Sequence, residues 1–560
     1  MIDLAIRNGL LVDGTGVPAY RGDLSVRDGR IVAVGGIASP AHTEIDASGL
    51  VVCPGFVDPH THFDAQLLFD PFATPLMEHG VTTVVTGNCS LSMAPLRASQ
   101  REKFQGMFRL IEEMPQEAFD EGVDWRWGED FGAMLEVLRE DLAMNVAPLV
   151  GHSVLRLFVM GDAAQARAAT ADEIAQMAQV LHRCLEAGAA GLSTSYIDID
   201  PGFQPVPSRW AQHAELDALC AVLGQHGRML QIVHEFFDPE LTVSRIEMLT
   251  DLSLRHGIAT TLSPLFHSTA MPQSAERIMD AIDRAWDAGA RVWPQVQTRP
   301  IDISFTLARR STMFLTIPGW WEVASLPDHA SKVAAFSDPS TRERLVAAAN
   351  ALASTAGLNM DPAGFVVREV VHDRNRDLLG RTLGDIAAER RTTPGDALID
   401  LALDEDLGTW FLRANLGHTD ETGVGELLRH PRVHIGASDA GAHIGTFATY
   451  GDTGYLFSRF VRGTGHLRLE EAVKKVTLDP CTIWSIPDRG ALRSGFAADV
   501  TVFDLATIDR GPEFVANDFP GGMRWSRRSE GVETVVVGGE VTWSRAGGYT
   551  AARRGQIVNS

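Results

Sequence analysis

Eight short apolar runs, each followed by a stretch with helical character, occupy the middle of this chain and limit the folds it can adopt. The runs cover residues 51–62, 81–89, 146–153, 189–196, 228–235, 258–265, 290–297 and 433–440. Apolar runs that alternate with helices predict parallel strands joined by crossover helices. Eight such units close into a (β/α)8 barrel of the TIM type. The sequence therefore predicts an α/β fold with this barrel as its main body.

The two ends of the chain have a different pattern, made of short strands. Residues 24–35 place Asp28 and Gly29 between two alternating apolar runs, which is a hairpin signal. Residues 498–504 and 532–543 have strand patterns near the other end. Neither end alone has enough strands for a stable sheet domain. We therefore expect residues 1–54 and 485–560 to form one small β-sandwich domain, and residues 55–484 to form the barrel.

Two segments exceed a minimal barrel. Residues 97–145 predict a helical insertion after the second strand, and residues 300–400 predict a larger one after the seventh. The larger insertion is long enough to act as a lid over a site at the barrel mouth. The run TWFLRAN at 409–415 is an alternative ninth strand, so the strand count stays open by one.

Charge and cysteine content exclude several kinds of partner. The chain has 49 Lys and Arg against 72 Asp and Glu, a net charge of −23. So acidic a chain is a poor binder of nucleic acid or of anionic membranes. No run approaches 18 uncharged apolar residues, and five cysteines make no disulfide framework. We expect a cytoplasmic enzyme that acts on a small-molecule substrate and has no nucleic-acid or membrane partner. Whether it forms a homo-oligomer stays open.

Side chains with metal-binding chemistry follow four of the predicted strands. His60 and His62 follow the first, Cys89 the second, His234 the fifth and Asp439 the eighth. Barrel enzymes carry their chemistry at these C-terminal strand ends. Two imidazoles two residues apart point the same way, thiolate favours zinc, and a carboxylate can bind a metal and accept a proton. Any one of these residues alone suits a structural role, but their occurrence together predicts a shared metal site.

The motifs PGFVDPHTHFD, TGNCS, SDAGAH and DRGALRSGFAADVTVFD resemble the amidohydrolase superfamily and, within it, the N-acyl-D-amino-acid deacylase (D-aminoacylase) group. The resemblance covers nearly the whole chain. It implies that His60, His62 and Asp439 hold the more buried metal, that Cys89 is a bridging thiolate and that His234 binds a second metal. Many relatives bridge two metals with a carboxylated lysine. The four lysines of this chain lie in helical or linker contexts, which favours the deacylase group over hydantoinases and dihydroorotases.

The sixth strand departs from the family pattern. Pro264 stands where the resemblance implies a histidine ligand of the second metal, and proline has no ligating side chain. His267, three residues later, is a tentative replacement. The expected cofactor is therefore one tightly bound zinc, with a second zinc left open.

Substrate contacts also depart from the pattern, because the family's arginine clamp for the amino-acid carboxylate is missing downstream of Asp439. Arg299, at the end of the seventh strand, is either a replacement clamp or an arginine paired with the insertion. His443 is expected to stabilise the oxyanion or to orient the substrate. His152 is either a substrate-site residue or a hydrogen-bonded wall residue.

The resemblance implies a metal-dependent hydrolase that cleaves a C–N amide bond, foremost of N-acyl-D-amino acids. A zinc-activated water would attack, with Asp439 as general base and then general acid. The alternatives are a hydrolase of cyclic amides or lactones, like a hydantoinase, and a non-catalytic scaffold; Cys89 disfavours a nucleobase deaminase. The acyl group, the side chain and the choice between D and L substrates stay open.

Overall fold

Eight parallel strands form the central barrel of the computed structural model, which describes residues 2–269, 271–311, 313–314, 317–351, 361–436 and 438–558. Their order is β16-β12-β11-β10-β9-β8-β7-β6, and all neighbours are parallel. An isolated parallel bridge between Thr61 and Ala440 joins the two ends of this sheet. The strands are β6 (Phe56–Asp58), β7 (Val81–Thr86), β8 (Asn145–Gly151), β9 (Gly191–Ser195), β10 (Met229–Val233), β11 (Ala259–Ser263), β12 (Arg291–Val296) and β16 (His434–Ile435).

Each of the eight predicted apolar runs overlaps one of these strands, so the predicted TIM-like barrel is confirmed. The strands carry continuous rather than alternating apolar patterns because both of their faces are buried. All residues of β7, β8, β9 and β10 are buried, for example.

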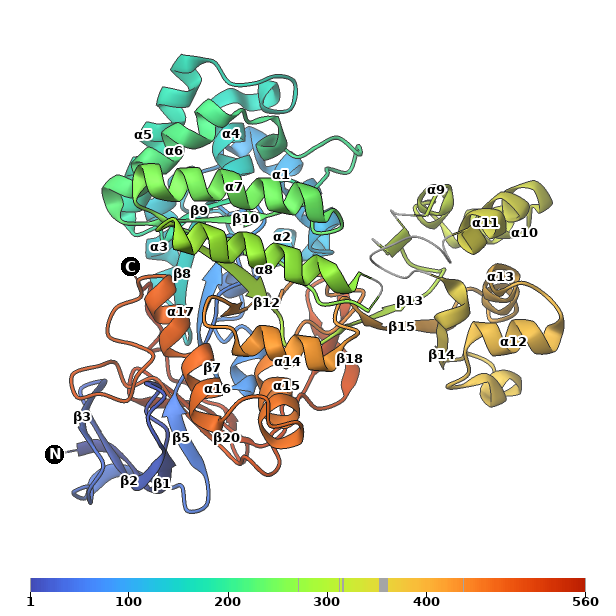
Figure 1. Cartoon of the computed structure of the whole chain (residues 1–560). Helices are drawn as coiled ribbons and strands as arrows, with labels where there is room; N and C mark the ends of the chain where they lie inside the picture. Colours follow the sequence, from blue (N-terminus) through green and yellow to red (C-terminus); the bar gives the residue numbers. More distant parts are fainter. Residues whose placement is uncertain are drawn as a thin grey trace.

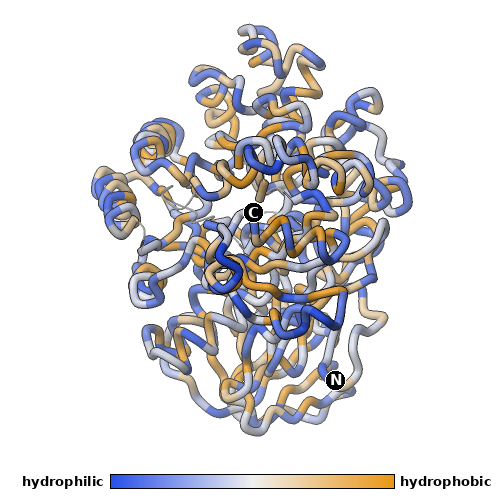
Figure 2. Tube along the Cα trace, turned by 90° about the vertical axis from the view of Figure 1, so that its right-hand side faces the viewer, coloured by the Kyte–Doolittle hydropathy of each residue, from blue (hydrophilic) through white to orange (hydrophobic). Residues whose placement is uncertain are grey.

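Helices surround the barrel strands (Figure 1). They are α4 (His152–Met160), α5 (Ala171–Ala187), α6 (His213–His226), α7 (Pro239–His256), α8 (Pro272–Asp287), α14 (Glu421–Arg429), α15 (Asp452–Tyr455), the π-helix η10 (Leu456–Gly463), α16 (Leu469–Val476) and α17 (Leu478–Ile483). Figure 2 shows hydrophilic and hydrophobic residues interspersed along the whole trace. In α5 a capping box of Thr170 and Glu173 fixes the first turn, and a stripe that includes Met177 and Leu181 faces the barrel core.

Both long connections carry structure of their own. Between β7 and β8 lie α1 (Arg101–Ile111), α2 (Gln116–Gly122) and α3 (Phe131–Arg139). Between β12 and β16 lie β13 (Ile301–Phe305), α9 (Trp320–Ala324), α10 (His329–Ser337), α11 (Pro339–Ala351), β14 (Val366–Glu369), α12 (Leu383–Arg390), α13 (Pro394–Asp404) and β15 (Trp410–Leu416). Residues 312, 315, 316 and 352–360 of the predicted larger insertion lie outside the described residues.

The larger insertion forms a lobe that projects from the barrel (Figure 1). It buries a separate hydrophobic cluster that includes Trp320, Phe336 and Phe411. Strand β15, which contains most of the TWFLRAN run, pairs with β13 and β14 inside this lobe. The ninth-strand alternative is therefore wrong: the run is a strand, but it belongs to the insertion.

Strands from both ends of the chain share a second, nine-stranded sheet. Its order is β22-β21-β20-β17-β5-β1-β2-β3, with β4 paired to β1. The strands are β1 (Ile2–Leu11), β2 (Tyr20–Arg27), β3 (Arg30–Val34), β4 (Ala41–Asp46), β5 (Val51–Pro54), β17 (Val500–Phe503), β20 (Val532–Val537), β21 (Glu540–Ser544) and β22 (Gly548–Tyr549). The antiparallel pair of β5 and β17 joins the two ends. A separate hairpin consists of β18 (Glu513–Phe519) and β19 (Gly522–Arg527).

Every helix within the described residues is too short or too polar to cross a lipid bilayer.

Candidate active site

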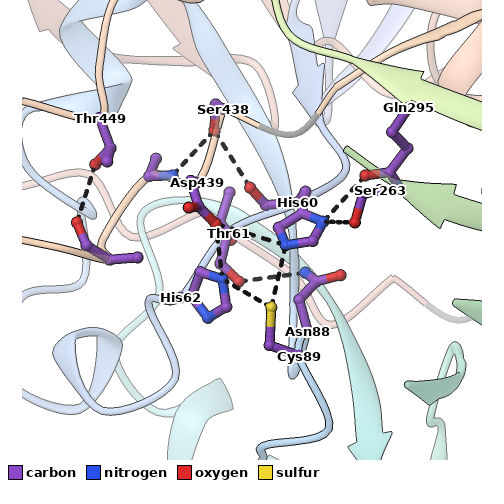
Figure 3. Close-up of polar contacts among 12 residues, drawn as sticks. His60, Thr61, His62, Asn88, Cys89, Ser263, Gln295, Ser438, Asp439 and Thr449 are labelled. Carbon is purple, nitrogen blue, oxygen red and sulfur yellow. Dashed lines mark hydrogen bonds and ion pairs between the residues drawn. The ribbon is translucent and has the colours of Figure 1, made fainter. Parts of the chain in front are cut away.

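The barrel closes at the position where the first and last strands end. The Asp439 amide donates to the His60 carbonyl at 3.2 Å, and the His62 amide donates to the Ala440 carbonyl at 2.8 Å. These two bonds hold the segment after β16 against the segment after β6. The carboxylate of Asp439 therefore lies beside both histidine rings, although 377 residues separate it from His62 (Figure 3).

Four metal-binding side chains converge at this point (Figure 3). Cys89 Sγ lies 3.5 Å from His60 Nε2 and 3.7 Å from His62 Nε2. Asp439 Oδ1 lies 3.6 Å from His60 Nε2 and 3.1 Å from His62 Nε2. In the part of the chain that the structure describes, His60, His62 and Cys89 form a compact donor group with ligand atoms within 4.8 Å of one another.

The spacing of these donor atoms fits a tetrahedral divalent metal. Bonds of about 2.0–2.3 Å to zinc place neighbouring ligand atoms about 3.3–3.8 Å apart. Three of the four separations above fall in this range, and the fourth is only slightly shorter. His60 is also held by its other ring nitrogen, because Nδ1 lies 3.0 Å from Gln295 Oε1 and 3.2 Å from Ser263 Oγ. Such contacts orient a histidine ligand and leave Nε2 free for a metal.

Burial sets the protonation of two donors. It lowers the pKa of His60 to about 4, so this imidazole is neutral and its nitrogen lone pair is available at neutral pH. It raises the pKa of the Cys89 thiol well above its ordinary value, so a nearby cation is needed to stabilise the thiolate. Burial also opposes ionisation of Asp439, but hydrogen bonds from His443 and His62 outweigh it and hold the pKa of this carboxyl well below its usual range. The site thus supplies negative charge for a cation.

Backbone strain is concentrated at these residues. Cys89, Asp439 and His443 have φ angles of 52°, 65° and 50°, in the left-handed region that side chains disfavour. Each such residue costs on the order of 1–3 kcal/mol. Gly87 makes the turn before Cys89 possible, because its φ is 79° and a Cβ there would lie 2.5 Å from the Leu149 carbonyl oxygen. The chain thus accepts strain at the positions that present the donors.

A glutamate that sequence reasoning missed lies behind His62. Glu112 Oε1 lies 3.1 Å from His62 Nδ1, and both side chains are 1% exposed. The glutamate follows α1 in the 97–145 insertion. No motif or strand end marks it in the sequence, so only the folded chain reveals it. A carboxylate on the second nitrogen of a histidine ligand fixes the orientation of the ring.

Replacing Glu112 with glutamine is expected to weaken metal binding and turnover by about 10- to 100-fold. The glutamine keeps the size of the side chain but loses the charge that faces His62. Metal affinity from competition with a chromophoric chelator tests this, with Glu117→Gln on α2 as a matched control. An affinity equal to that of the unaltered protein would show that Glu112 only fills space.

The structure does not bring two of the expected second-metal ligands into the compact donor group. His234 is buried, and its Nε2 has no hydrogen-bond partner among the described atoms. It faces a small apolar cavity lined by Phe236, Pro264 and other residues. His267 packs its ring against the position of Gly423, and its Nδ1 lies 3.6 Å from Asp420 Oδ2. His267 thus contacts the beginning of α14 rather than the donor group.

His152 and Arg299 also have partners that differ from the expected substrate contacts. His152 is fully buried between Thr194 Oγ1 and Glu215 Oε1, both at 2.9 Å. These contacts match the wall-residue alternative for His152. The Arg299 guanidinium is 2% exposed, pairs with Asp452 at 2.8 Å and donates to the Ser438 carbonyl at 2.9 Å. Arg299 therefore supports the residue before Asp439, through partners that lie outside the 300–400 insertion.

His443 remains at the site, beside the carboxylate it was expected to assist. Its Nε2 lies 3.4 Å from Asp439 Oδ2, and its ring stacks on Phe447. Although burial lowers the pKa of His443, the contact with Asp439 raises it to about 9.

Two further acids, Asp64 and Asp198, each bury a carboxylate oxygen without a hydrogen-bond partner among the described atoms. Asp64, two residues after His62, continues the alternation of the HxH motif, a signal that could have identified it.

This chain resembles a known protein family, two enzymes of similar sequence and a solved structure. A model of the amidohydrolase family matches residues 43–543. The chain is 29% identical to a D-aminoacylase of Alcaligenes xylosoxydans xylosoxydans, over 99% of this chain and 97% of the relative. It is 30% identical to an N-acyl-D-aspartate deacylase of the same organism, over 99% of this chain and 95% of the relative. A solved N-acyl-D-glutamate deacylase from Bordetella bronchiseptica, complexed with zinc and a phosphonate that mimics the tetrahedral intermediate, is 28% identical and superposes with a TM-score of 0.69 over 100% of both chains.

Proposed function

Because the chain belongs to the amidohydrolase family, we propose that it is a zinc-dependent hydrolase of N-acyl-D-amino acids. One observation carries the proposal: His60, His62, Cys89 and Asp439 converge from three separate strand ends with the spacing of metal ligands. The full-length similarity to deacylases of N-acyl-D-amino acids supports the substrate class.

These four side chains would hold one zinc ion tightly. When bound, zinc lowers the pKa of a coordinated water toward about 7 and polarises a carbonyl group. A second zinc would need His234, whose buried Nε2 lacks a partner, but Pro264 supplies no ligand beside it. We therefore propose one essential metal, with a second that binds more weakly.

The chain's own residues perform the proton transfers. Asp439 accepts the proton of the attacking water on a carboxylate oxygen and later delivers it to the leaving nitrogen. His443, 3.4 Å from Asp439, keeps that carboxylate ionised before attack and donates toward the oxygen that becomes negative as the amide carbonyl is attacked. Glu112 holds the His62 ring in place. The larger insertion is proposed to cover the barrel mouth and to exclude water during turnover.

The zinc-loaded protein is expected to hydrolyse N-acetyl-D-amino acids with a kcat/KM of about 10⁴ M⁻¹s⁻¹ or more. A panel of acetylated D- and L-amino acids, a hydantoin and a lactone, assayed by release of the free amine or acid, tests this. Removal of metal with a chelator should abolish turnover, and one equivalent of zinc should restore most of it. Faster turnover of the hydantoin or lactone, or no turnover of any compound by the reloaded protein, would contradict the proposed substrate class.

We further propose a cytoplasmic, self-associating enzyme. The five cysteines are all free and four are buried, as expected in a reducing compartment. Cell fractionation and size-exclusion chromatography test the two statements.

A further inference from the structure

A cavity of about 660 Å³ opens at the opposite end of the barrel from the candidate active site. We call it the basal cavity and define it by Arg228, Ile258, Arg291, Arg429 and Lys475, together with the side chains of α16 and α17 that face them. Met229, Ala259 and Arg291, which line it, are the first residues of β10, β11 and β12. The metal donors follow the last residues of the barrel strands, so the two sites lie at opposite ends of the sheet.

The basal cavity gathers positive charge in an acidic protein. Five basic side chains line it: Arg228, Arg291, Arg429, Lys474 and Lys475. Among the ion pairs of the described residues, only Lys474 has a carboxylate partner, Asp479 at 3.1 Å. The other acid of the lining, Glu471, pairs with Arg468 outside the cavity and also lies within electrostatic range of Arg429. Because acidic residues outnumber basic ones by 72 to 49, unpaired cations at one place call for an explanation.

The strand register places two of these arginines on one rim. Ala259 pairs with Arg291 across neighbouring parallel strands, and Arg228 directly precedes β10 on the other side of β11. Neighbouring strands are about 4.8 Å apart, so the two arginine backbones lie about 10 Å apart. Arg228 Nε is buried without a hydrogen-bond partner among the described atoms. The side chains of Arg228 and Arg291 both line the cavity, and Arg291 also donates to the Gly257 carbonyl oxygen.

A buried lysine completes the charged wall. Lys475 is 8% exposed, and its Nζ donates to the carbonyl oxygens of His430 at 3.0 Å and Val433 at 3.4 Å. These bonds leave the third ammonium hydrogen for another acceptor. Burial lowers the pKa of Lys475 to about 8, because an ammonium group is disfavoured away from water, and the nearby carboxylates Asp479 and Glu471 offset only part of this shift. An anion in the cavity would offset the rest of the shift.

The remaining wall is apolar and rigid. Trp484 is 1% exposed, and its Nε1 donates to His434 Nε2 at 3.1 Å. Trp293 lies against Trp286 with the ring centroids 4.6 Å apart. Of these rings, Trp293 and Trp484 line the cavity together with Ile258, next to the cations. Helix α16 supplies the lysines, and Trp484 directly follows α17. In Figure 1 both helices lie on the side of the barrel that faces β1, β2 and β5.

We propose that the basal cavity binds a small anion, with a phosphate or carboxylate group held by Arg228, Arg291 and Lys475 and a flat apolar part against Trp293. The guanidinium fork matches both kinds of oxyanion. The site is separate from the metal donors, so its occupant binds without displacing substrate.

Isothermal titration calorimetry on the zinc-loaded protein tests the proposal with AMP, inorganic phosphate and succinate, each at the same ionic strength set with sodium chloride. We expect one site per chain. AMP bound more tightly than phosphate would assign a phosphate group with an aromatic ring, and succinate bound most tightly would assign a carboxylate ligand. The double variant Arg228→Gln/Arg291→Gln should weaken binding at least about tenfold.

Two controls guard the result. Arg429→Gln changes only the exposed rim, keeps the wall intact and should weaken binding about threefold or less. The double variant Arg21→Gln/Arg390→Gln removes the same charge from exposed positions elsewhere and should leave affinity unchanged. The proposal is overturned if no probe binds more tightly than chloride, or if binding survives in Arg228→Gln/Arg291→Gln and disappears when zinc is removed.

Discussion

Replacing Asp439 with asparagine is expected to lower kcat by about 10²- to 10⁴-fold while the protein still binds zinc. The amide keeps the size of the side chain, and His60, His62 and Cys89 remain as a compact donor group. What is lost is the oxygen proposed to accept the proton of the attacking water. Turnover of an N-acetyl-D-amino acid, measured beside zinc content by elemental analysis, separates these two roles.

The surface variant Asp172→Asn makes the same chemical change on an exposed turn of α5 and should retain full activity. Thermal unfolding of both variants shows whether the fold is intact. If Asp439→Asn bound zinc and retained more than a tenth of the turnover, another group would have to be the base. A variant that lost zinc altogether would instead make Asp439 mainly a metal ligand.

The fold was predictable because its pattern is local. The barrel strands of two to seven residues lie in apolar runs that alternate with helical stretches, and this alternation is visible without any tertiary information. The donors were predictable for the same reason, since His60, Cys89 and Asp439 all follow such runs. Closure of the barrel then brings strand ends together whatever their separation in sequence.

Contacts made by side chains across the fold were not predictable. Glu112 contacts His62 from an insertion. The position of that insertion does not follow from the alternation of barrel strands and helices in the sequence. Arg299 follows a strand end, as a substrate ligand would, but its guanidinium turns toward Asp452 and the Ser438 carbonyl. The strand fixes the position of the Cα atom of a residue. The direction of its polar group depends on the hydrogen-bond and ion-pair partners around it.

The donor positions also show that stability and function compete at this site. A left-handed backbone at Cys89 is unfavourable for any residue with a Cβ, and a glycine there would relieve it. Only a side chain with a thiol, however, places sulfur between His60 and His62. The proposed metal site would therefore explain why a strained backbone is kept at Cys89.

Two substitutions at Cys89 are expected to separate these effects. Both Cys89→Ala and Cys89→Gly remove the thiolate, so zinc affinity should fall by at least about 100-fold. Replacing a residue that only hydrogen-bonds to a metal ligand already lowers metal affinity about 10- to 100-fold. In the zinc-free proteins, the glycine variant should have the larger free energy of unfolding, by about 1 kcal/mol, because it relieves the left-handed backbone at φ 52°.

Chelator competition measures the affinities, and denaturant unfolding of the zinc-free variants measures the difference in stability. Cys184→Ala, which removes a buried thiol from α5 far along the chain from the donors, controls for the loss of a sulfur atom and should keep zinc affinity unchanged. Equal stabilities of Cys89→Ala and Cys89→Gly would mean that the left-handed turn carries no strain. Zinc affinity that persisted in both would remove Cys89 from the metal site, and the site would then depend on the two histidines and Asp439 alone.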